Sequence, residues 1–126
     1  MLNFEEVNVL GDILNTTWGK YSTTKAPTMS IKSSLSGDVL TLTYTTIVTL
    51  ANDRNLRDQV VSEEESSAKI LADYIKVCKK DFKEAGGRAL KVKEISTRDT
   101  VEIISTSPYT PKRPAYYRRI TSYRIS

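Results

Sequence analysis

The clearest pattern in the chain is an alternation of apolar residues with threonines between Val39 and Leu50. Successive side chains of a strand point to opposite faces, so this alternation predicts a strand with one buried face over residues 39–50. A second alternating run, Met29–Leu35, precedes it, and Ser36-Gly37-Asp38 between them favours a turn. We therefore predict a hairpin over residues 29–50. Its second strand would span about 40 Å, long enough for the hairpin to protrude from the domain.

Two segments show the three- and four-residue spacing of amphipathic helices. The first covers residues 3–18, where Asn3 and Glu6 stand in the positions of a capping box. The second covers residues 63–85, with Ser62 as its cap and Gly86-Gly87 as its end. The apolar stripe of the first helix is expected to contain Phe4, Val7, Leu10, Leu14 and Trp18. That of the second is expected to contain Ile70, Leu71, Tyr74, Ile75, Cys78, Phe82 and Ala85.

The remaining segments complete the predicted order of elements. Residues 51–61 have the composition of an irregular polar link. Two further strands are predicted at 90–95 and 100–106, paired across a turn. Residues 107–114 contain three prolines and predict an extended arm, and 115–125 predicts a last strand.

The order α-β-β-α-β-β-β predicts a single α+β domain over residues 1–126. Helices and hairpins that do not alternate strictly favour an antiparallel or mixed sheet with the two helices packed on one face. No apolar stretch has the roughly 20 residues needed to cross a bilayer. The N-terminal segment carries acidic residues where a secretion signal carries basic ones. Cys78 is the only cysteine, so no internal disulfide is possible, and we expect a cytoplasmic location.

The chemistry available to the chain is limited because it contains no histidine. Catalytic triads and nearly all transition-metal sites depend on that residue. A lone cysteine makes no zinc site, and neither common glycine-rich phosphate loop is present. The acidic run 63–65 fits a helix N-terminus, where the dipole favours negative charge. We therefore expect no catalytic residues, no metal, no cofactor and no enzymatic activity.

The net charge of +4 is distributed unevenly along the chain. Residues 1–87 carry 10 basic and 12 acidic residues, whereas residues 88–126 carry 9 basic and 3 acidic ones. The last strand interleaves tyrosines with arginines, and alternation places Tyr117, Arg119 and Tyr123 on one face, with Tyr116, Arg118 and Arg124 on the other. The candidate interaction residues are Lys112, Arg113, Tyr116, Tyr117, Arg118, Arg119, Tyr123 and Arg124.

Three roles fit this strand. Arginine and tyrosine are enriched at the energetic centres of protein–protein interfaces. Arginine also contacts phosphates while tyrosine stacks on bases, so single-stranded nucleic acid is an alternative partner. The strand is equally well explained as a sheet edge whose charges prevent aggregation.

A histidine-free chain with an N-terminal helix, a long hairpin and a proline-rich arm before a terminal strand resembles certain virion proteins of tailed bacteriophages. The resemblance is to small connector, neck or tail-terminator proteins, and it covers the order of elements only. It implies a structural role in a homo-oligomeric assembly, contacts with other virion proteins, and a place in a virion assembled in the host cytoplasm. It assigns no site residues.

Overall fold

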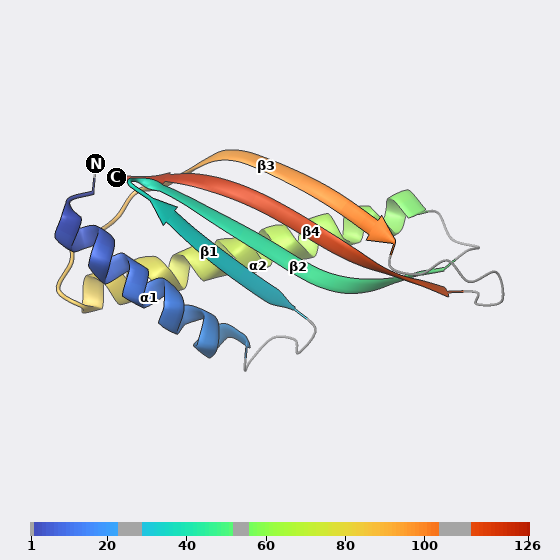
Figure 1. Cartoon of the computed structure of the whole chain (residues 1–126), viewed down its shortest axis with the longest axis horizontal. Helices are drawn as coiled ribbons and strands as arrows, with labels where there is room; N and C mark the ends of the chain where they lie inside the picture. The colour runs from blue at the N-terminus through green and yellow to red at the C-terminus, as the bar shows by residue number, and fades with distance from the viewer. Residues whose placement is uncertain (1, 23–28, 52–55, 104–111) are drawn as a thin grey trace.

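The computed structural model describes residues 2–22, 29–51, 56–103 and 112–126 (Figure 1). Their order is α1 (Phe4–Ser22), β1 (Ser30–Ser36), β2 (Val39–Ala51), α2 (Leu56–Glu84), β3 (Val92–Ile103) and β4 (Lys112–Ile125). The strands form one antiparallel sheet in the order β1-β2-β4-β3. The predicted α+β class is confirmed.

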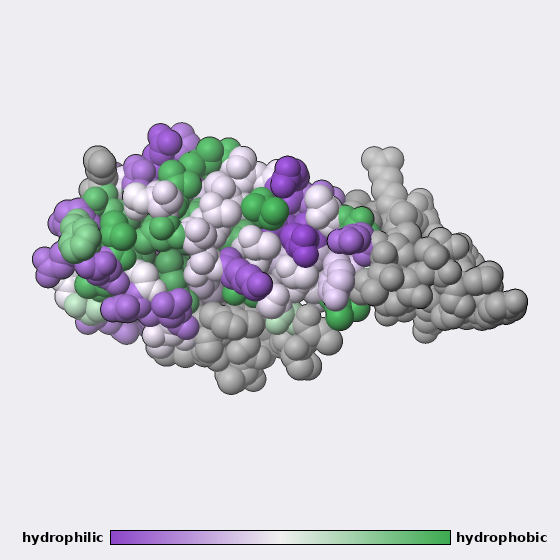
Figure 2. All heavy atoms as spheres, viewed as in Figure 1, coloured by the Kyte–Doolittle hydropathy of each residue, from purple (hydrophilic) through white to green (hydrophobic). Residues whose placement is uncertain are grey.

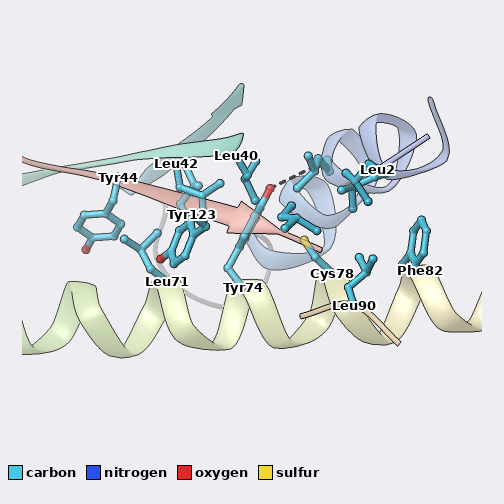
Figure 3. Packing of buried hydrophobic residues seen from close by; sticks show 14 of the residues in the cluster. Leu2, Leu40, Leu42, Tyr44, Leu71, Tyr74, Cys78, Phe82, Leu90 and Tyr123 are labelled. Atoms are coloured by element: carbon cyan, nitrogen blue, oxygen red, sulfur yellow. Dashed lines mark hydrogen bonds between the residues drawn. The ribbon is translucent and has the colours of Figure 1, made fainter. Parts of the chain in front are cut away.

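The core lies between the sheet and the helices. Helix α2 runs along one face of the sheet, and α1 packs against α2 and β1 (Figure 1). In the core, Leu40, Leu42 and Tyr44 of β2 point toward α2 (Figure 3). The Tyr74 hydroxyl of α2 donates a hydrogen bond of 3.3 Å to the carbonyl oxygen of Leu14, which ties the two helices together. Both helices lie on one face of the sheet, as predicted.

The N-terminus of α1 has the predicted capping box. The Asn3 side chain accepts a hydrogen bond from the Glu6 backbone N–H at 2.8 Å, and the Glu6 carboxylate accepts one from the Asn3 N–H at 3.1 Å. One prediction for this helix is wrong, because Phe4 is 83% exposed. The buried face centres on Leu10 and Leu14, and Phe4 lies about 100° away from it around the helix axis, at the first residue of the helix. The Trp18 side chain lies outside the described residues.

Helix α2 begins earlier than predicted. It starts at Leu56, so the expected irregular link over 51–61 is wrong for residues 56–61, and Ser62 is inside the helix rather than at its cap. Residues 52–55 of that link lie outside the described part of the chain. The C-terminal end is as predicted: the Gly86 N–H bonds the Lys83 carbonyl and the Gly87 N–H bonds that of Phe82, a Schellman motif in which Gly86 has φ of +92°.

The hairpin predicted for residues 90–95 and 100–106 is wrong. Residues 92–103 form the single strand β3, which pairs along its length with β4. The register shifts between Glu94 and Ser96, which marks a β-bulge in the segment expected to approach the turn. Residues 104–106 lie outside the described part of the chain.

The extension of β2 beyond its neighbour also differs from the prediction. Pairing with β1 stops at Thr45, whereas β2 continues to Ala51 with β4 as its partner. The predicted hairpin 29–50 is present as the antiparallel pair of β1 and β2, and the part of β2 that continues past the end of β1 is paired with β4. The C-terminal part of the predicted arm, 112–114, belongs to β4, and residues 107–111 lie outside the described residues. No helix of the described chain is both long and apolar enough to span a membrane.

Candidate interaction surface

The two helices cover one face of the sheet and leave the other uncovered, and we call the uncovered side the open face. Alternation assigns its residues, because Leu40, Leu42 and Tyr44 are buried under the helices and their neighbours in β2 point away. The register then extends the open face across all four strands. One row across the sheet, for example, contains Lys32, Thr43, Ile120 and Arg98.

The open face carries an excess of positive charge. Five cationic side chains lie on it, whereas Glu102 is the only carboxylate that the described strands place there. None of the five makes an ion pair with a described carboxylate. The cations are Lys32, Lys93, Arg98, Arg118 and Arg124.

The cations concentrate on β3 and β4. Arg124 lies directly opposite Lys93 in the register, and Arg98 lies diagonally from Arg118, since Arg98 pairs with Ile120. Diagonal neighbours on a sheet face are about 7–8 Å apart. Like charges this close raise the local positive potential, which favours a negatively charged partner.

Hydroxyl groups and a few apolar side chains fill the rest of the open face. Thr41 Oγ1 and Ser122 Oγ are 3.3 Å apart across β2 and β4. At the far end of the face, Ile47 is 46% exposed and the neighbouring Tyr116 is 38% exposed. Figure 2 shows a mainly pale surface over the strands with scattered strongly hydrophilic and hydrophobic side chains. The open face is therefore a mixture of polar, charged and apolar side chains rather than a continuous apolar surface.

Three of the predicted interaction residues lie on the open face: Tyr116, Arg118 and Arg124. Their assignment to one side of β4 agrees with the predicted alternation. Lys112 and Arg113 lie in β4, paired with Ala51 and Leu50, and their side chains lie outside the described residues.

The expectation that Tyr117 and Tyr123 contact a partner is wrong, because both lie in the core. Tyr117 is fully buried, packs edge-on against Tyr44 with ring centroids 6.4 Å apart, and has its hydroxyl 3.3 Å from Ser67 Oγ. Tyr123 is 8% exposed, and burial raises its pKa to about 12. Both rings face α2 and are unavailable to stack on a ligand.

Arg119 is a structural residue rather than a free cation. Its Nε and Nη2 donate hydrogen bonds of 2.8 and 3.0 Å to the two carboxylate oxygens of Asp99, directly opposite on β3. These hydrogen bonds hold the pKa of Asp99 below its usual range and raise the pKa of Arg119. The predicted interaction role of Arg119 is therefore replaced by a bidentate cross-strand pair on the helix side of the sheet.

Sequence reasoning missed Lys32, Lys93 and Arg98 as members of this surface. Lys32 belongs to β1, and the other two belong to a strand that was expected to be a hairpin. Only the strand order and register bring them beside Arg118 and Arg124. A single sequence contains no local signal for that proximity.

Two described groups outside this surface have pKa values raised by burial. The Cys78 thiol lies in the core, and burial raises its pKa to about 11, which disfavours the nucleophilic thiolate. Burial also raises the pKa of Glu63, which is partly covered on α2.

The chain matches no protein-family model, no curated protein and no solved structure.

Proposed function

We propose that the protein is a non-enzymatic assembly subunit that binds other protein subunits, including copies of itself, through the open face of its sheet. The observation that carries this proposal is the uncovered face of a four-stranded sheet whose opposite face is covered by two helices. The virion of a tailed bacteriophage is the particle whose small proteins the organisation of the chain resembles, and we propose it as the setting.

The composition of the open face supports a protein partner. Exposed Tyr116 and Ile47 supply apolar contact area, and the arginines supply multivalent hydrogen-bond donors. Threonine and serine hydroxyls between them are small and make a flat surface. A face of this kind suits a polar interface that forms between folded partners.

Nucleic acid is the second candidate, and it is favoured by the cations of β3 and β4 that make no ion pair with a described carboxylate. Arg98, Arg118 and Arg124 lie on the open face, and arginines on a protein surface commonly contact phosphates. Base stacking has weaker support, because Tyr117 and Tyr123 are buried and Tyr116 alone among the β4 tyrosines remains exposed. The protein partner is therefore the first proposal.

Size-exclusion chromatography with multi-angle light scattering tests the proposal. We expect the apparent mass to rise above that of the monomer as the protein concentration increases from about 1 to 100 μM, the range of a modest interface. A monomer across this whole range contradicts the proposal. Fluorescence anisotropy with a labelled oligonucleotide tests the second candidate, which requires affinity that falls steeply with salt.

A further inference from the structure

We propose that the occupant of the open face is a second copy of this chain, which docks the outward, acidic side of its helix α1 there. This inference rests on the proposed assembly function and specifies its contact. Two surfaces of the described molecule carry opposite charge, and each includes exposed apolar groups.

The outward side of α1 carries the carboxylates of Glu5 and Asp12, and none of its described side chains, which end at Thr17, is a cation. Phe4, Asn8, Asp12 and Asn15 follow three- and four-residue spacing and are exposed, with Glu5 beside them. No lysine or arginine occurs between residues 2 and 19. Asp12 also borders a shallow hollow between the helices, whose lining includes Asp81 and Glu84; Glu84 is 4.0 Å from Lys80 Nζ, so the negative charge there is partly balanced.

Phe4 is the unexplained residue of this helix. A phenylalanine that is 83% exposed contributes nothing to the core of its own chain. Buried in an interface, an aromatic side chain of this size contributes strongly to binding. Its position one residue before Glu5 places an apolar anchor beside an acidic group.

The open face has the complementary features. Its cations are unpaired among the described residues, and Tyr116, Ile47 and Ile120 provide apolar contacts beside them. From Arg118 to Arg124 the cations extend over roughly 20 Å of β4, at about 3.3 Å per residue. From Phe4 to Asp12 the acidic side of α1 extends over roughly 12 Å, at 1.5 Å per residue, so this first part of the helix fits within the length of the face.

The size of the face favours an arrangement in which each copy makes two such contacts. Four strands and five rows of side chains cover roughly 14 by 27 Å, which is below the approximately 800 Å² per partner of a standard interface. Helix α1 packs on the helix side of the sheet (Figure 1), so its outward side and the open face belong to different sides of the molecule. Each copy can therefore dock its α1 on one neighbour and accept the α1 of another, in a head-to-tail arrangement that uses both surfaces of every inner copy.

Charge reversal with mixing tests this contact. The helix variant is Glu5→Lys with Asp12→Lys, and the sheet variant is Arg98→Glu with Arg118→Glu. All four side chains are at least partly exposed, so circular dichroism and thermal unfolding are expected to confirm folding. The matched control is Lys79→Glu, which changes the net charge on the outer side of α2.

We expect each double variant alone to associate at least tenfold more weakly than the natural chain, and the control to associate normally. An equimolar mixture of the two variants is expected to restore association, because every helix–sheet contact between unlike variants again joins opposite charges. Raising salt from 50 to 500 mM is expected to weaken association of the natural chain, since the Debye length shortens.

Three results overturn the inference. The first is that both double variants associate as strongly as the natural chain. This result would keep the proposed assembly function but exclude the contact between α1 and the open face. The second is a mixture that does not recover association. The third is a monomer that binds a 20-nucleotide DNA probe through the sheet cations, with binding lost in the sheet variant alone, which assigns the face to nucleic acid.

Discussion

Arg118 and Arg119 are adjacent on β4, yet the structure gives them opposite roles, so replacing each with alanine tests the assignment of the two sheet faces. Arg118 is on the open face without an ion-pair partner among the described residues, and Arg119 pairs with Asp99 on the helix side. We expect Arg119→Ala to destabilise the fold and Arg118→Ala to leave its stability nearly unchanged.

The magnitude follows from the burial and geometry of the pair. The Arg119 and Asp99 side chains are only 14% and 19% exposed, and their hydrogen bonds are bidentate. Removing one partner of a fully buried pair costs about 3–5 kcal/mol, and a charged hydrogen bond contributes about 1.5–3 kcal/mol. For this partly covered pair we expect a loss of about 2–3 kcal/mol. That loss corresponds to roughly 8–12 °C in Tm for a domain of this size. An exposed arginine is expected to change stability by less than about 0.5 kcal/mol.

Urea denaturation followed by circular dichroism measures both variants. A double-mutant cycle with Asp99→Asn is expected to give a coupling energy above about 1 kcal/mol. Because the pKa of Asp99 is depressed in the folded state, the carboxylate contributes stability at neutral pH and loses it as the pH falls from about 4 through that depressed pKa. The stability difference between the natural chain and Asp99→Asn should therefore shrink in acid.

Two results refute this reasoning. One is an equally small change in the free energy of unfolding for both alanine variants, which would mean that Arg119 is exposed to solvent and not paired. The other is a difference between the natural chain and Asp99→Asn that persists unchanged to pH 2, which shows that the Asp99 charge does not contribute.

Four further outcomes follow from the core and the helices. Gly86→Ala is expected to destabilise the domain by about 1 kcal/mol because the residue has φ of +92°. Gly11→Ala, inside α1 with open space around its Cβ position, should instead stabilise it by up to about 1 kcal/mol, and thermal unfolding separates the two. Cys78 is expected to react with a thiol reagent at pH 8 only in denaturant, because its thiol is buried and its pKa is raised to about 11; fast labelling of the folded protein would contradict its burial. Tyr74→Phe removes the hydrogen bond to the Leu14 carbonyl and should cost about 1 kcal/mol in a urea titration, whereas an unchanged midpoint would mean that this bond adds nothing.

Patterns within a few residues of sequence correctly predicted the start of α1, the end of α2 and the buried face of β2. The Asn3–Glu6 capping box and the Gly86-Gly87 end are local hydrogen-bonded motifs, and both are present. The alternation of β2 identified its buried face because that pattern has a period of two. The start of α2 was missed because Ser62 is a residue type that favours a helix cap, whereas the helix begins six residues earlier, at Leu56.

Predicting the residues of the open face requires knowledge of pairing between strands that are far apart in the sequence. Alternation separated Tyr116 and Arg118 from Tyr117 and Arg119, but it did not indicate which side the helices cover. The segment 96–99 has the composition of a turn, yet it stays in β3 because β4 pairs with it through a bulge. Arg98 therefore joins the open face through long-range pairing alone.

The central claim is that the open face is covered when the protein assembles, and site-specific labelling measures this directly. A single Thr100→Cys variant places a thiol on the exposed open-face side of β3, and Ala68→Cys places one on the outer side of α2 as a control. With Cys78 buried, the rate of maleimide labelling reports the new thiol. We expect concentrating the protein into its associated state to slow labelling at position 100 at least severalfold while position 68 reacts at an unchanged rate. Unchanged labelling at position 100 in a demonstrably associated sample would contradict the account.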